Sequence, residues 1–314
     1  WMISENSLLD RKRTPIIWPE KLNNFFNVKN LYLKLEGFCP TGNHKFWFAQ
    51  IACKEYLKGN KYDGIAVASC GHYASSLAWL CLRLQIKTKL YVIKDSPITI
   101  PQSRTVGVDY GSCNYDEAVS NCLNFCKSSN YLNATPGSNL CKKFIRQYNS
   151  ISYEIIDFLG DTPIVVFCPV GNGTTVAALH SGFRSMENLE TTKRLIAVGI
   201  DRNSLFNLSV NLNSQTNWEL EPISSNNPLD KTQAIRAIKE SNGEFICVNK
   251  LSIYKSLILL SQLESIKCHF SSAVCIAGLK RILETKKISS YEKIVLILTT
   301  LYNYKVPYEN RSSF

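Results

Sequence analysis

Several features that mark common classes of protein are missing from this sequence. No apolar run reaches the ~18 residues that a membrane-spanning helix needs, so we expect no membrane span. The first residues, Trp1-Met2-Ile3-Ser4, have no long apolar core of the kind found in a secretory signal. There is no internal repeat and no low-complexity segment. What is left is a globular chain of 314 residues, long enough for one large or two ordinary domains.

The cysteines follow no spacing that is typical of a metal site or a disulfide framework. There are twelve of them and no Cys-x-x-Cys, and the nearest pair, Cys122 and Cys126, lies inside a helical pattern. The four histidines do not cluster with the cysteines, so we expect no metal. Twelve thiols without a disulfide pattern indicate a reducing compartment, and we therefore predict a cytoplasmic protein.

The charge is positive but is not gathered in one place. The formal net charge is +11, and the lysines are scattered among Asn, Ser and Tyr. No dense basic block with interleaved aromatic residues is present, so we expect no nucleic-acid partner. An anionic cofactor or substrate is compatible with this charge but is not required by it.

Short apolar segments alternate with helical patterns along most of the chain. We predict strands at residues 31–36, 64–69, 88–93, 163–168, 194–200, 244–248 and 293–298. We predict helices at residues 45–57, 73–84, 115–126, 139–159, 174–184, 231–240, 253–263 and 271–284. The strands are apolar throughout, which favours an α/β fold with parallel sheets covered on both faces. Residues 131–138 are turn-rich and predict a seam, and residues 203–229 predict a long connection over a site.

The segment 33–45 (LKLEGFCPTGNHK) carries the first chemical signal. An extended apolar run ends in a Gly- and Pro-containing loop, which delivers Lys45 to the start of a predicted helix. Unpaired backbone N–H groups and the positive end of the helix dipole disfavour an ammonium ion there. A neutral amine is what a Schiff base with an aldehyde cofactor requires. The alternative is an ordinary surface lysine after a turn.

The second signal is a glycine-rich loop between a predicted strand and a predicted helix. Gly171-Asn172-Gly173-Thr174-Thr175 could hold an anion, because glycines allow a close approach and the backbone N–H groups and hydroxyls can donate. It is neither a Walker loop nor Gly-x-Gly-x-x-Gly. The alternative is a tight turn in which a Thr caps the helix.

Two further segments repeat the pattern of a strand followed by small or hydroxyl-bearing residues. Residues 66–76 place a loop before a helix whose N-terminal amides would suit a carboxylate, and His72 there could touch a ring or phenolate oxygen. A capping or packing role for His72 is the alternative. The strand at 293–298 ends in Thr299 and Thr300, whose hydroxyls could bond a pyridine nitrogen or simply end the strand.

Together and in this order, these segments resemble the fold-type II pyridoxal-phosphate enzymes. That group includes tryptophan synthase β, cysteine synthase, serine/threonine dehydratase and threonine synthase, and the chain looks most like the threonine synthases. The resemblance runs from about residue 13 onward and includes residues 34–37, 110–118, 171–175, 234–241, 271–274 and 298–299.

The resemblance implies a role for each candidate residue. Lys45 would form the Schiff base with pyridoxal phosphate and then act as general base and acid. Thr299 would face the pyridine nitrogen, His72 the phenolic oxygen, and His44 would lie near the phosphate as in tryptophan synthase β. The phosphate would be held by Gly171, Asn172, Gly173, Thr174 and Thr175, and the substrate carboxylate by Ser69, Cys70, Gly71 and Tyr73.

The resemblance also implies the architecture and the reaction. We expect two α/β domains with mostly parallel twisted sheets covered by helices and the active site in the cleft between them. The large cofactor-binding domain would comprise residues 1–40 and 146–314, and the small domain residues 41–145. A homodimer acting on a small amino acid is implied, by β- or γ-elimination or replacement of a leaving group. A dehydratase, a racemase and a catalytically degenerate paralogue are the alternatives.

The chain departs from the threonine synthase pattern around the substrate. Those enzymes usually read Ser-Phe-Lys-Asp-Arg around the lysine, whereas this chain has Asn43-His44-Lys45-Phe46-Trp47. His72 stands at the position of an Asn, and Tyr73 at that of a Thr. We therefore predict that the cofactor is retained and that the substrate differs.

Overall fold

The computed structural model describes residues 8–59, 61–186, 189–200, 205, 221–225, 227–285 and 288–302. Within these residues the strands form two separate sheets. A four-stranded sheet has the order β5-β4-β3-β6, and a six-stranded sheet has the order β1-β2-β10-β7-β8-β9. All neighbouring strands are parallel except the β1–β2 pair. The fold is therefore α/β with mostly parallel sheets, as predicted.

The smaller sheet has helices on both faces. Its strands are β3 (Gly64–Ser69), β4 (Thr88–Ile93), β5 (Val106–Ser112) and β6 (Tyr131–Asn133). Its helices are α3 (Phe46–Leu57), α4 (His72–Arg83) and α5 (Tyr115–Ser128). Successive side chains of a strand point to opposite faces. Accordingly, Ala66 and Ala68 pack in the cluster of α5, whereas Ile65 and Val67 pack in the cluster of α3 and α4.

The larger sheet is covered in the same way. Its strands are β1 (Ile16–Ile17), β2 (Leu31–Lys34), β7 (Ile164–Pro169), β8 (Lys193–Gly199), β9 (Glu244–Cys247) and β10 (Lys293–Ile297). Its helices are α2 (Glu20–Phe26), α6 (Cys141–Leu159), α7 (Thr174–Ser185), α8 (Lys231–Glu240), α9 (Lys250–Glu264) and α10 (Phe270–Leu283). Val166 and Leu195 face the core shared with α6 to α8, and Phe167 and Ile196 face the core under α9 and α10.

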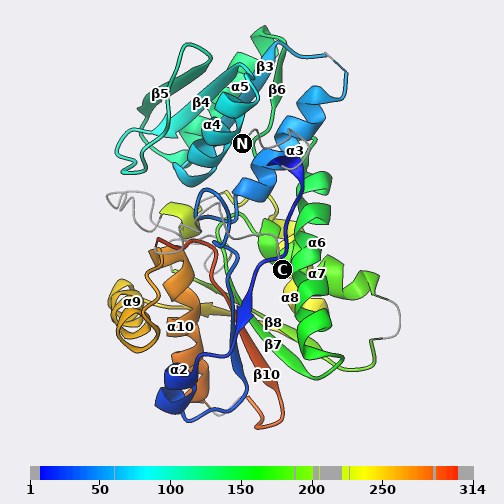
Figure 1. Ribbon diagram of the computed structural model, residues 1–314, viewed down its shortest axis with the longest axis vertical. Helices are drawn as coiled ribbons and strands as arrows, with labels where there is room; N and C mark the ends of the chain where they lie inside the picture. Colours follow the sequence, from blue (N-terminus) through cyan, green and yellow to red (C-terminus); the bar gives the residue numbers. More distant parts are fainter. Residues whose placement is uncertain are drawn as a thin grey trace.

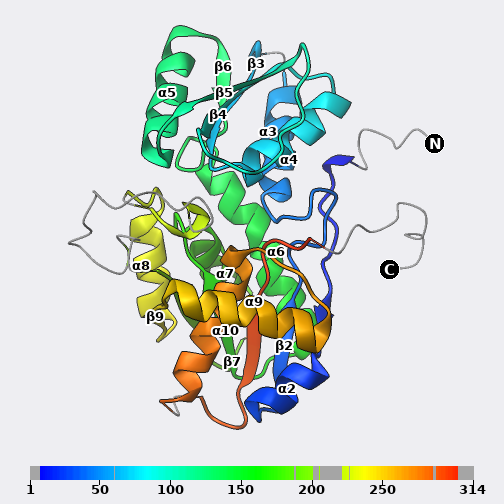
Figure 2. The same cartoon turned by 90° about the vertical axis from the view of Figure 1, so that its left-hand side faces the viewer.

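The two sheets lie at opposite ends of an elongated molecule (Figure 1). Helix α6 of the larger unit runs up to the smaller one and packs against α3, and both views show it between the two units (Figure 2). The domain boundaries at residues 41 and 145 stay a prediction.

The predicted elements agree with the structure, and four observed strands or helices were not predicted. All seven predicted strands and all eight predicted helices are present; β3, β4 and α8 have the predicted bounds, and the others have shifted ends. Strands β1, β5 and β6 and helix α2 are additional. The turn-rich seam expected at residues 131–138 was partly wrong, because Tyr131–Asn133 forms β6 beside β3. Most of the connection predicted at residues 203–229 lies outside the described residues.

Candidate active site

One cavity collects nearly all of the candidate residues. It is lined by His44, Lys45, Ala68, Ser69, Cys70, His72, Tyr73, Tyr115, Pro136, Pro169, Gly171, Asn172, Gly173, Thr174, Thr175, Pro222, Ile223, Ser224, Ser225, Ser271, Thr299 and Thr300. Its empty space, including the open mouth, is about 890 Å³. It lies where β3, β7 and β10 end, and the carboxyl ends of parallel strands are where such folds bind ligands. Of the predicted site residues, only Gly71 is not part of this lining.

The Lys45 loop is attached to the end of β10. The His44 N–H donates to the Thr299 carbonyl at 2.8 Å, and the Leu301 N–H donates to the Gly42 carbonyl at 2.8 Å. From the other side, the Tyr148 hydroxyl of α6 donates to the His44 carbonyl at 2.9 Å. These bonds hold Lys45 at the first turn of α3, in the same cavity as Thr299.

The Lys45 amine lies in apolar surroundings. Its Nζ is 4.6 Å from the centre of the Phe48 ring. Burial lowers the pKa of Lys45 to about 8, against smaller opposing effects of Cys70, Asp230 and Cys168. A larger share of the amine is therefore neutral near pH 8 than for an exposed lysine.

The glycine-rich loop is shaped by close backbone contacts. A Cβ atom on Gly171 would collide with the Pro222 carbonyl oxygen, and one on Gly173 would meet the Ala234 Cβ at 2.7 Å. Gly173 also has a φ of 95°, which disfavours any other residue. The loop therefore leads into α7 with its backbone close to the cavity, as an anion site requires.

Two polar side chains of this loop are already bonded within the protein. The Asn172 amide donates to the Tyr115 hydroxyl at 3.2 Å, and its oxygen faces the Ser225 hydroxyl and the Leu229 N–H. The Thr174 hydroxyl donates to the buried carboxylate of Asp230. The loop's capacity to hold an anion therefore depends mainly on its backbone and on Thr175.

The loop after β3 is organised by Ser69. The Ser69 hydroxyl oxygen accepts the N–H groups of Gly71 and Ala74 at 2.9 and 3.1 Å. Gly71 has a φ of 128°, and a Cβ there would meet Ile98 at 2.8 Å. The Tyr73 hydroxyl donates to the Ala134 carbonyl at 3.0 Å. Tyr73 thus lines the cavity, while its hydroxyl is bonded to the backbone.

The two histidines that line the cavity are neutral, and His44 is buried whereas His72 is half-buried. Burial, and then the nearby Lys45, lower the pKa of His72 to about 4, and the same two causes lower the pKa of His44. Nε2 of His72 and Nδ1 of His44 have no hydrogen-bond partner within the described residues. The His72 ring contacts the His269 ring edge-on, with centroids 4.6 Å apart. Both unpartnered nitrogens belong to residues that line the cavity.

Thr299 is buried two residues beyond the end of β10, and its carbonyl accepts the His44 N–H of the Lys45 loop. Its Oγ1 is 3.3 Å from the Ser272 Oγ, and the Ser272 hydroxyl also accepts the Thr300 N–H at 2.8 Å. A neutral hydroxyl pair therefore stands at the end of β10, where the sequence predicted a hydroxyl.

Several lining residues were missed by the sequence analysis as site residues. Tyr115, Pro136 and Pro222–Ser225 fall within residues 110–118, 131–138 and 203–229, which the sequence analysis named, but none of them was given an individual role. The last of these segments was predicted as a connection over a site, and its residues 222–225 line the cavity. Ser271 was quoted as part of the resemblance but was given no role, and Thr300 was named only together with Thr299 as a hydroxyl that could bond a pyridine nitrogen.

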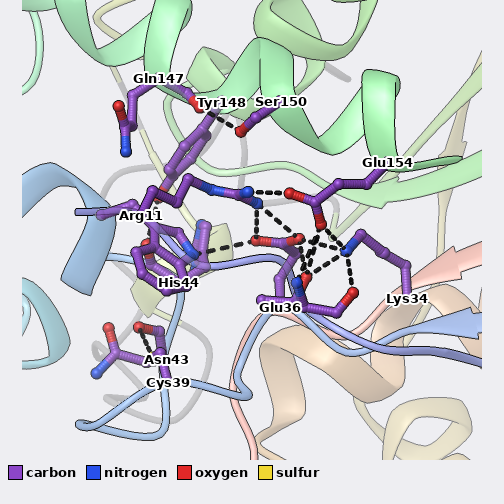
Figure 3. A network of polar contacts seen from close by, with 12 residues as sticks. Arg11, Lys34, Glu36, Cys39, Asn43, His44, Gln147, Tyr148, Ser150 and Glu154 are labelled. Atoms are coloured by element: carbon purple, nitrogen blue, oxygen red, sulfur yellow. Dashed lines mark hydrogen bonds and ion pairs between the residues drawn. The ribbon is translucent and has the colours of Figure 1, made fainter. Parts of the chain in front are cut away.

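A buried ion-pair network lies beside the lysine loop (Figure 3). Glu36, two residues beyond the end of β2, contacts Lys34 and Arg11, and its Oε2 accepts the Trp47 indole N–H of α3 at 3.2 Å. Glu154 of α6 pairs with the same two cations. Phe46 and Trp47, which differ from the threonine synthase pattern, are therefore core residues and do not line the cavity.

Two classes of feature are not found in the described part of the chain. No three or more His, Cys, Asp or Glu side chains gather there as metal ligands would. None of the helices there combines the length and hydropathy needed to cross a membrane.

The chain is similar in sequence to curated threonine synthases. The chain is 27% identical to the threonine synthase of Halalkalibacterium halodurans over 303 residues, covering 93% of this chain and 82% of that protein. It is 26% identical to the threonine synthase of Methanosarcina acetivorans, covering 91% and 73%.

Solved structures of the same fold include two enzymes with other names. The processed threonine deaminase isoform 2 of Solanum lycopersicum aligns with a TM-score of 0.71 at 21% identity, over 92% of this chain and 79% of that one. The serine racemase of Dictyostelium discoideum aligns with a TM-score of 0.69 at 19% identity, over 93% of both chains. Residues 8–300 match the family of pyridoxal-phosphate dependent enzymes. The chain therefore belongs to this family, whose cofactor is pyridoxal phosphate.

Proposed function

We propose that this protein is a pyridoxal-phosphate lyase or transferase that eliminates or replaces a β- or γ-leaving group of an amino acid, as a threonine synthase-like enzyme. The observation that carries the proposal is a half-buried lysine with a lowered pKa in the same cavity as a glycine-rich helix N-terminus and a buried threonine. The curated relatives named above, over nine-tenths of this chain, are threonine synthases.

The cavity fits the cofactor on its own residues. The backbone of Gly171 and Gly173 leaves no room for a Cβ atom, and the first turn of α7 offers N–H groups for a phosphate. At the other end, Thr299 offers a neutral hydroxyl, and Nε2 of His72 lacks a partner. We infer that these groups hold the phosphate, the pyridine nitrogen and the phenolic oxygen respectively.

Bound pyridoxal phosphate would supply an aldehyde that condenses with an amine and a ring that withdraws electrons from the adjacent carbon. Lys45 would hold the cofactor covalently and then move a proton to and from the substrate with its Nζ. The Thr299 hydroxyl cannot supply a full charge to the ring nitrogen, which favours elimination and replacement over transamination. The N–H groups at the start of α4 would hold the substrate carboxylate.

The substrate is expected to differ from that of the threonine synthases. Tyr73 lines the cavity where the resemblance expects a threonine, and His72 replaces an amide. Both changes lie beside the expected carboxylate site and leave the glycine-rich loop unchanged. We therefore infer a small amino-acid substrate whose leaving group is still to be identified.

The proposal is tested by absorbance spectroscopy of the purified protein. Added pyridoxal phosphate should give a band near ~410–430 nm. Lys45→Ala should abolish the band, whereas Lys54→Ala, on the same helix, should keep it because that side chain is partly exposed and pairs with Asp10. No band in the wild-type protein would refute the proposal.

The reaction is identified by titrating O-acetyl, O-phospho and O-succinyl amino acids in deuterated water. A spectral change with loss of the leaving group supports elimination or replacement. Deuterium exchange without loss of the leaving group would instead indicate a racemase, and an inert, cofactor-loaded protein a degenerate paralogue.

We also infer a cytoplasmic homodimer. None of the twelve cysteines, all within the described residues, takes part in a disulfide, which suits a reducing compartment. The homodimer is an expectation from the family, which analytical ultracentrifugation would test.

A further inference from the structure

Asp230 is a buried carboxylate directly behind the Gly171–Thr175 loop. It is 1% exposed, and one of its carboxylate oxygens accepts the Thr174 hydroxyl. The other oxygen accepts the Cys141 thiol at 2.7 Å. The Asp230 N–H also donates to the Asn172 carbonyl at 3.0 Å. The carboxylate is thus attached to the loop through both its side chain and its backbone.

Three helix N-termini meet at this carboxylate. Cys141 is the first residue of α6, Thr174 is the first residue of α7, and Asp230 directly precedes α8. Asp230 makes no capping bond to α8, and its side chain is directed to the other two helices. Each helix N-terminus carries a partial positive charge, which stabilises a buried anion. The Asp230 carboxylate therefore already supplies part of the negative charge that these helix N-termini attract.

The carboxylate also changes what the loop can offer to a ligand. The Thr174 hydroxyl donates its hydrogen bond to Asp230, and the Asn172 amide donates one to the Tyr115 hydroxyl. The charge of Asp230 also affects Lys45: it raises the pKa of Lys45, against the larger lowering effect of burial. A dianionic phosphate at this loop would meet fewer donors and one like charge.

We propose that Asp230 is a built-in counter-charge that weakens the hold of this site on the phosphate of its cofactor. The inference rests on the proposed function, because it takes the Gly171–Thr175 loop as the phosphate site. The site then prefers pyridoxal phosphate over pyridoxal by less than a loop without the carboxylate would. Its occupancy accordingly follows the concentration of cofactor around the protein.

The test compares two ligands on the cofactor-free, full-length protein. Pyridoxal phosphate and pyridoxal are titrated separately by absorbance, with inorganic phosphate as a competitor. The dissociation constant of pyridoxal divided by that of pyridoxal phosphate gives the contribution of the phosphate group to binding, because the aldehyde chemistry is common to both. Asp230→Asn removes the charge but keeps an oxygen for Thr174, and should raise the preference for the phosphorylated ligand about tenfold.

A matched control removes a carboxylate from another helix N-terminus beside the cavity. Asp116, in the first turn of α5, is exposed. After burial and Cys70, it is one of the smaller causes that raise the pKa of the cavity residue Tyr115. Asp116→Asn should leave the ratio within about twofold of the wild-type value, because Asp116 makes no bond to the loop.

The outcomes separate the two proposals. If Asp230→Asn leaves the preference for pyridoxal phosphate over pyridoxal unchanged or lowers it, the counter-charge proposal is overturned. Asp230→Ser must raise this preference as much as Asp230→Asn does. A wild-type preference above roughly a thousandfold for pyridoxal phosphate would also overturn it, even if neither variant folds. If the wild-type protein binds neither aldehyde, the proposed function fails instead.

Discussion

Replacing Glu36 by glutamine should be among the most destabilising single changes in this protein. The Glu36 side chain is fully buried, and its oxygens contact Lys34, Arg11, Thr14 and Trp47 (Figure 3). Two cations and two carboxylates make up the network, so it is neutral as a whole. Glu36→Gln leaves two buried cations opposite Glu154 alone. Removing one partner of a buried ion pair costs about 3–5 kcal/mol of unfolding free energy.

The pKa of Glu36 gives an independent magnitude. Burial alone would raise this pKa, but Lys34 and Arg11 outweigh burial and lower it from 4.5 to about 2. A difference of this size corresponds to roughly 3 kcal/mol. Because the pKa is lower in the folded state, the contribution is present above about pH 4.5 and is lost as the pH falls towards 2.

Urea unfolding at pH 7, followed by circular dichroism, measures the effect. The control is Asp157→Asn, which breaks an exposed ion pair between Arg13 and α6. The side chains of that pair, Arg13 and Asp157, are 75% and 59% exposed, so the control should cost less than about 0.5 kcal/mol. A cost for Glu36→Gln within 1 kcal/mol of the control would refute the reasoning.

Three further predictions concern the site and the thiols. Because burial lowers the pKa of Lys45 to about 8, the formation of the pyridoxal band in the cofactor-free protein should rise with pH around a midpoint near 8; a midpoint near 10 would contradict this. Gly171→Ala should weaken cofactor binding more than tenfold in the absorbance titration, because its Cβ would overlap the Pro222 carbonyl. Gly160→Ala, where a Cβ meets no atom within 4 Å but φ is 74°, should leave binding unchanged and cost about 1 kcal/mol of stability. A thiol reagent should react fastest with Cys113 in the native protein, since it is the one fully exposed cysteine of the twelve, and with all twelve in denaturant; rapid reaction of the seven buried thiols would show an opened core.

The predictability of each strand follows from its burial. Strands β3 and β7 are buried along their whole length, and such strands appear in the sequence as continuous apolar runs. Strand β5 has Gly107 and Gly111 exposed and Asp109 half-buried, because it forms an edge of the smaller sheet. Its sequence therefore carries no apolar run. Strand β6 has three residues, too few for any periodicity.

The candidate site was predictable because its loops share one structural position. Each recognised motif follows the carboxyl end of a buried parallel strand, and these ends meet at one edge of each sheet. The missed residues reach the cavity differently. Tyr115 approaches from the start of α5 and Ser225 from the segment before α8, where they contact the two ends of the Asn172 amide. These contacts join residues 57 and 53 positions apart and have no local signal.

Asp230 shows why a local rule fails at the same place. Asn114 and Asp230 each directly precede a helix, and the sequence gives no reason to treat them differently. The Asn114 side chain accepts the Glu117 N–H of its own helix, so a serine or an aspartate could replace it with little effect. The Asp230 side chain instead reaches Thr174 and Cys141, which are 56 and 89 positions away. An exchange between Asn and Asp therefore changes only the cap of the following helix at residue 114. At residue 230 it changes the charge beside the Gly171–Thr175 loop.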